Sequence, residues 1–80
     1  GKYAPTFVIC CDRLYLFTLF EIKEIDPKKV EKVGYHYARG GSFLVEIQSP
    51  ETTKLEVYTS SFPYLKSLIR KYNPNADIKD

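Results

Sequence analysis

The stretch SFPYLKSLIRKY, residues 61–72, decides the fold class expected for this chain. Its large apolar side chains recur at helical spacing, and its basic and small polar side chains fall on the opposite side. The apolar stripe consists of Phe62, Leu65, Leu68, Ile69 and Tyr72. Pro63 suits a first helical turn, a serine before it can cap that turn, and Asn73-Pro74 stops the helix. The pattern therefore predicts one amphipathic helix over residues 62–72.

Five strand-like runs rich in β-branched and aromatic residues precede this helix. They cover about residues 3–11, 14–23, 30–37, 42–48 and 53–58. Pro27 interrupts the chain after the second run, and Gly40-Gly41 permit the positive φ of a tight turn after the third. Because the connections are short, each strand should pair with the next. We expect an α+β fold: a curved five-stranded antiparallel meander, or partial barrel, capped by the helix, with residues 75–80 frayed.

The composition is that of a small folded domain. The 80 residues are 44% hydrophobic and 15% aromatic, enough for one core, so we expect a single domain over residues 1–80. The net charge of +2 supplies no electrostatic argument for binding nucleic acid or membranes. The chain lacks Met and begins at Gly1, so we expect Gly1 to be a residue left by tag removal, which leaves open whether the chain is a domain of a longer protein. Its longest apolar run, residues 14–20, is too short to cross a bilayer, and we expect a soluble, cytoplasmic domain.

The second strand-like run is apolar on both of its faces. Leu14, Leu16 and Phe20 alternate with a second apolar set. A strand of this kind is either covered on both sides or offers one face to a partner. The first interpretation is a second small core formed with the N-terminal segment or the tail. The second is a surface that binds a protein partner or another copy of the chain, made of Tyr15, Phe17, Leu19, Leu44 and Tyr58.

Two other binding classes compete with this interpretation. A basic loop is a candidate site for a phosphoinositide or another anionic headgroup at a membrane surface. Its residues are Lys28, Lys29, Lys32 and Arg39, but they better suit a charged loop that keeps a sheet edge in solution, interleaved with Asp26 and Glu31. A tyrosine-rich strand is a candidate platform for single-stranded nucleic acid, through Tyr35, Tyr37 and His36. Strand aromatics are more often core or cross-strand pairs.

The chain shows little that indicates catalysis. His36 is its only imidazole and has no acid or nucleophile at suitable spacing, so we expect no enzyme, catalytic residue or small-molecule substrate. The carboxylates of residues 21–26 lack the glycine and spacing of a calcium loop, and we expect neither a metal nor a cofactor. Cys10 and Cys11 would point to opposite faces of a strand, which predicts two buried or half-buried free thiols in a reducing compartment. A disulfide between them or a metal held by the pair is the less favoured alternative, since no other thiol and only one His could complete a site.

Residues 11–17, CDRLYLF, resemble the T-D-x-R-L-x-x-x strand of bacterial pleckstrin-homology-like and GRAM-type domains. Residues 24–33 resemble the I-P-x-x-x-I-x-x-V connection of those families, and a glycine hairpin, two strands and a helix follow in the same order. The resemblance spans about Phe7 to Tyr72 and implies a PH-like module that binds a ligand or a protein. The full barrel of the family has seven strands, against five counted here. The basic signature by which some members hold phosphoinositides is not recognisable in the first hairpin.

Overall fold

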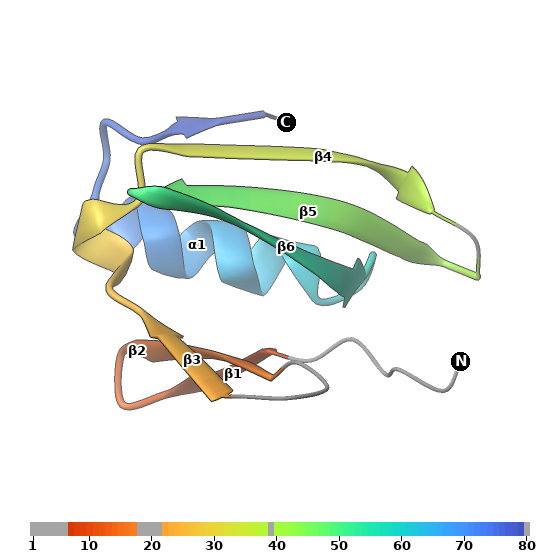
Figure 1. The fold of residues 1–80 in the computed structure, drawn as a ribbon, viewed down its shortest axis with the longest axis horizontal. Helices are drawn as coiled ribbons and strands as arrows, with labels where there is room; N and C mark the ends of the chain where they lie inside the picture. The colour runs from red at the N-terminus through yellow and green to blue at the C-terminus, as the bar shows by residue number, and fades with distance from the viewer. Residues whose placement is uncertain (1–6, 18–21, 39, 80) are drawn as a thin grey trace.

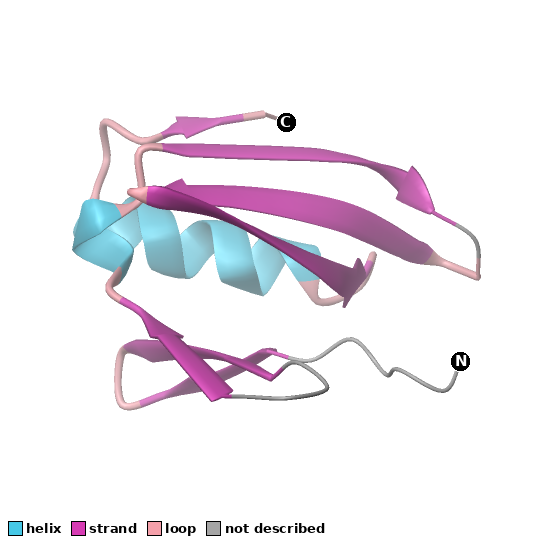
Figure 2. Ribbon diagram, in the orientation of Figure 1, coloured by secondary structure: helices cyan, strands magenta, loops and turns pink. Residues whose placement is uncertain are grey.

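The structure is a computed structural model that describes residues 7–17, 22–38 and 40–79. These residues form seven strands in two sheets and one C-terminal α-helix, as Figure 1 shows. The α+β class and the C-terminal helix are therefore confirmed. The prediction of a single five-stranded sheet is wrong. The described strands divide into a three-stranded and a four-stranded sheet, and they form no closed barrel (Figure 2).

The three-stranded sheet is antiparallel, in the order β1-β2-β3. Its strands are β1 (Phe7–Cys10), β2 (Arg13–Phe17) and β3 (Ile22–Ile25). The run expected to be one strand over residues 14–23 is thus two strands, because the chain turns back on itself and Phe17 pairs with Ile22. Neither Gly nor Pro marks this reversal, so the sequence shows only a largely apolar run that Glu21 closes.

The four-stranded sheet has the order β6-β5-β4-β7. Its strands are β4 (Lys32–Ala38), β5 (Ser42–Ser49), β6 (Glu51–Tyr58) and β7 (Asp77–Ile78). The first three are antiparallel, and the turn before β5 has Gly40 at φ 76° and Gly41 at φ 75°, the backbone for which glycine was expected there.

The C-terminal tail is not frayed as expected, because it pairs with β4 as the parallel strand β7. The Asp77 amide donates to the Glu31 carbonyl at 2.9 Å, and the Lys79 amide donates to the Val33 carbonyl at 3.0 Å. The polar composition of this tail conceals its pairing, which depends on the free edge of a strand about forty residues earlier.

The helix α1 (Phe62–Tyr72) has the expected bounds and buries Phe62, Leu65, Leu68 and Ile69. The expected serine cap is not formed: the Ser61 side chain makes no capping hydrogen bond, and the Ser61 carbonyl accepts from the Tyr64 amide at 3.2 Å. Within the described residues, no helix combines the length and the apolar character needed to cross a membrane.

Both sheets and the helix contribute to a single core. In the view of Figure 1, α1 lies between the two sheets. Phe62 packs against the four-stranded sheet, with ring centroids 4.8 Å from Tyr35 and 5.3 Å from Phe43. The other core side chains on the strands are Leu14, Leu16, Ile25, Val33, Val45, Ile47, Leu55 and Val57. Tyr37 shares the face of Val33 and Tyr35 on β4 but is 70% exposed, beyond the ring cluster at Phe62.

The buried stripe of α1 yields a stability prediction. Leu65 is fully buried, so Leu65→Ala should lower the free energy of unfolding by about 2–5 kcal/mol through lost burial and the cavity left behind. Tyr64, its neighbour, is 71% exposed, and Tyr64→Ala should change the free energy by no more than about 0.5 kcal/mol. Urea denaturation of both variants measures the difference, and equal losses would contradict the packing described for α1.

Candidate functional site

The three-stranded sheet has one face toward the core and one face away from it. Leu14 and Leu16 of β2 are buried, and the alternation of a strand therefore directs Tyr15 and Phe17 outward. The register places Val8 opposite Tyr15, and Ile22 opposite Phe17. Four large side chains from three strands thus share the outer face. We call Val8, Tyr15, Phe17 and Ile22 the outer-face patch.

The outer-face patch is exposed to solvent. Ile22 is 65% exposed, Val8 46% and Phe17 37%, and Tyr15 is half-buried. A polar pair borders it on the same face, where Arg13 Nη1 lies 3.1 Å from Glu24 Oε2. Antiparallel sheets with a free face usually carry polar side chains there, so an apolar centre with a charged rim is the arrangement typical of a protein-binding surface.

Sequence reasoning found half of this patch. Tyr15 and Phe17 were expected on an outer face, and Leu19 lies outside the described residues. Val8 and Ile22 were missed. Ile22 was missed because the reversal after Phe17 restarts the alternation, so that Ile22 shares the face of Phe17 instead of the face of Leu16. The signal available in the sequence was that Val8 and Ile22 are large apolar residues in runs short enough to form strands.

Leu44 and Tyr58 belong to the other sheet. Leu44 on β5 is half-buried and pairs with His36 and Glu56, and Tyr58 at the end of β6 is 46% exposed. They share the outer face of the four-stranded sheet, so the structure does not join them to Tyr15 and Phe17 through one continuous sheet face.

The basic candidates are distributed over different elements. Lys28 and Lys29 lie on the short 3-10 helix η1 (Pro27–Lys29), and Lys32 begins β4. Arg39 lies outside the described residues. Lys32 lines a shallow hollow of about 150 Å³ on the four-stranded sheet that also contains Glu46. This hollow therefore contains a carboxylate beside the lysine.

The tyrosine-rich strand does not present its rings together. Tyr35 packs within the ring cluster, 4.7 Å from Phe43 between centroids, and is half-buried. Tyr37 is exposed on the same face, and His36 is exposed on the opposite face of β4. These three side chains thus do not form one stacking surface of the kind that single-stranded nucleic acid requires.

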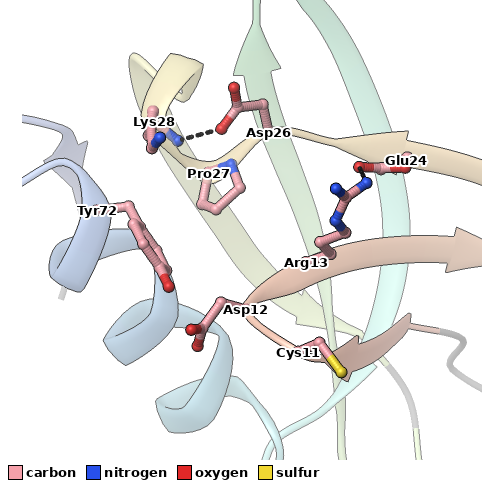
Figure 3. A pocket seen from close by; sticks show the side chains of 8 residues that line it. All are labelled: Cys11, Asp12, Arg13, Glu24, Asp26, Pro27, Lys28 and Tyr72. Carbon is pink, nitrogen blue, oxygen red and sulfur yellow. Dashed lines mark hydrogen bonds and ion pairs between the residues drawn. The ribbon is translucent and has the colours of Figure 1, made fainter.

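A polar hollow of about 330 Å³ lies where the β1–β2 turn approaches the end of α1 and the start of η1 (Figure 3). Its lining residues are Cys11, Asp12, Arg13, Glu24, Asp26, Pro27, Lys28 and Tyr72. The Asp26 carboxylate accepts from the Lys28 amide at 3.0 Å and so shapes η1. At the C-terminal end of α1, the Asn73 side chain donates to the Val30 carbonyl at 2.7 Å. This hydrogen bond ties the end of the helix to the residue that follows η1.

Asp12 links the three-stranded sheet to the helix. Hydrogen bonding with Tyr72 is the largest influence on the pKa of Asp12, and Lys71 Nζ lies 3.4 Å from Asp12 Oδ1. The Tyr72 hydrogen bond and the Lys71 contact hold the pKa of Asp12 below its usual value, against a smaller opposing effect of desolvation. The same hydrogen bond raises the pKa of Tyr72, since the carboxylate favours the protonated phenol.

These two pKa shifts predict a pH dependence of stability. A lowered folded pKa means that the Asp12 contribution is present above its unfolded pKa of about 4 and is lost as the pH falls through the folded value. The Tyr72 contribution is present below about pH 10 and is lost as the pH rises through its raised folded value. Tyr72→Phe should therefore destabilise the protein at neutral pH and much less at about pH 2. Thermal denaturation across pH measures this, and an equal loss at both pH values would contradict the role given to the hydrogen bond.

The two cysteines differ from their expected placement. Both are exposed free thiols, not buried or half-buried. Cys11 is not a strand residue but the first of two turn residues that join β1 to β2, so the expected alternation does not apply to it. Their sulfur atoms consequently lie 3.6 Å apart and not on opposite faces.

No family model, no curated protein and no solved structure matches this chain.

Proposed function

We propose that this chain is a non-enzymatic interaction module whose outer-face patch binds protein, with a second copy of the chain as the leading partner. One observation carries the proposal: apolar side chains from all three strands of the small sheet are exposed side by side, and Ile22 is 65% exposed. Burying a Val, Ile or Phe side chain completely is worth about 1.5–3 kcal/mol, so even partial burial of four such residues offers a substantial driving force.

The border of the patch supports the same function. Arg13 and Glu24 pair across β2 and β3 with side chains 63% and 46% exposed. An exposed ion pair contributes little to stability but adds charge complementarity at the rim of an interface. The patch thus combines an apolar centre, whose burial is favourable, with a charged rim that remains solvated, as in protein interfaces.

The other binding classes have weaker support. An anionic membrane surface contacted through Lys28, Lys29, Lys32 and Arg39 would need concentrated positive charge, and both Lys28 and Lys32 line hollows that also contain carboxylates. Binding of single-stranded nucleic acid would rest mainly on Tyr37, which is 70% exposed, since Tyr35 is half-buried between Phe43 and Phe62. The resemblance to PH-like domains remains a prediction that agrees with a binding module; six strands precede the helix here.

Light scattering over a range of concentrations tests the proposal. The wild-type chain should self-associate as its concentration rises, and Ile22→Ser combined with Val8→Ser should shift it to the monomer by at least about tenfold in dissociation constant, because apolar burial is lost on both partners. The variant should keep its cooperative thermal transition, since both side chains face solvent in a single copy.

Two control variants separate the patch from general effects. Tyr64→Ser removes an equally exposed apolar surface from α1 and should leave association unchanged. Leu16→Ser lies on the same sheet but on its buried face and should unfold the protein. A wild-type chain that stays monomeric at every concentration, or a double variant that unfolds, would overturn the proposal.

A further inference from the structure

The turn that carries Cys11 has an uncommon backbone. Cys10 pairs with Arg13, so Cys11 and Asp12 form a two-residue hairpin loop. Cys11 has φ 55° and Asp12 has φ 64°. Positive φ at both positions defines the mirror-image turn that suits a hairpin, but Asn-Gly or Asp-Gly normally occupies it because side chains disfavour this backbone. A cysteine at the first of these positions is therefore unusual.

This backbone brings two thiols together. On a continuous strand, adjacent side chains point to opposite faces. The left-handed conformation of Cys11 rotates its side chain out of that alternation, and the two sulfur atoms lie 3.6 Å apart, in hydrogen-bond contact. Both residues are exposed, so the pair is open to a ligand from solution. The Asp12 contacts with Lys71 and Tyr72 hold the turn in place.

The sulfur spacing suits chelation. A tetrahedral ion bound to sulfur at about 2.3 Å separates two ligand sulfurs by roughly 3.8 Å. A disulfide, in contrast, requires about 2.05 Å and a specific dihedral angle. The observed 3.6 Å is close to the chelating distance and far from the covalent one. Little movement of the turn is needed to place one ion between both sulfurs.

We propose that Cys10 and Cys11 form a bidentate thiolate site for a thiophilic metal or metalloid ion. Soft thiolate ligands select such ions over hard cations. Within the described residues, no cluster of three or more His, Cys, Asp and Glu side chains surrounds an ion position. The ion must therefore bring its remaining ligands with it, as a trivalent arsenical with one carbon substituent does.

The binding reaction balances without an oxidant or a reductant. The hydrogen bond between the thiols raises the pKa of the Cys10 thiol. With an arsenoxide, two As–S bonds form, the bonds between arsenic and oxygen break, and the two thiol protons leave with that oxygen as one water. Arsenic remains trivalent throughout. A divalent cation displaces the same two protons.

Phenylarsine oxide is the probe for this site. The wild-type chain, reduced with a phosphine, should take up one arsenical, lose both titratable thiols, and retain the adduct against excess monothiol while releasing it to a small dithiol. Cys10→Ser and Cys11→Ser should each weaken retention by at least about a hundredfold, because the second bond is then no longer intramolecular. Intact mass and thiol titration measure the stoichiometry, and circular dichroism confirms that the variants keep the wild-type fold.

A matched variant keeps the number of thiols and changes only their placement. Cys11→Ser combined with Val8→Cys puts both thiols on one face of β1, on residues about 6.6 Å apart at Cα. It should behave like a single-thiol variant. Retention equal to that of the wild type would show that the turn geometry is not responsible. A wild-type chain that loses the arsenical to monothiol as readily as Cys10→Ser does would overturn the proposed site.

Discussion

Burial of the apolar stripe of α1 is the constraint on which the rest of the structure depends. Phe62, Leu65, Leu68 and Ile69 complete one core that contains side chains from both sheets. The three-stranded sheet has strands of only four or five residues, and so small a sheet needs a packed face to persist. Its inner side chains Leu14 and Leu16 are covered because the helix and the larger sheet supply the other side. The helix therefore stabilises both sheets at once.

Polar contacts at the margins orient the small sheet against this core. Asp12 binds the end of α1 through Tyr72 and Lys71, and Lys23 of β3 donates to the Thr53 hydroxyl of β6 at 3.0 Å. These contacts are exposed or half-exposed and add little stability singly. Together they connect the three-stranded sheet to α1 and β6, two elements far along the chain. The inner face of the sheet therefore stays on the core, and its outer face stays in solvent.

The two surfaces for which we propose binding both belong to the three-stranded sheet. The register puts Cys10 on the same face as Val8 and Tyr15, so the thiol pair lies at the end of the outer-face patch where the hairpin turns. The surfaces differ in chemistry: the patch gains by excluding water, whereas the thiols act by bonding to a soft ion. The other described candidates are distributed over the four-stranded sheet and η1, where Lys28 and Lys32 line hollows with carboxylates and Tyr35 packs against Phe43.

The sequence alone determined the features that depend on neighbours along the chain. The helical period placed α1 over residues 62–72, and the two glycines located the turn before β5. Tertiary structure alone decided where the apolar run after Leu14 reverses, that the tail pairs with β4, that the strands divide into two sheets, and that two adjacent sulfurs meet. The first three features depend on hydrogen-bond partners and packing surfaces that are distant in sequence. The contact between the sulfurs depends on a left-handed turn that contains no glycine. Local side-chain patterns therefore do not predict these features.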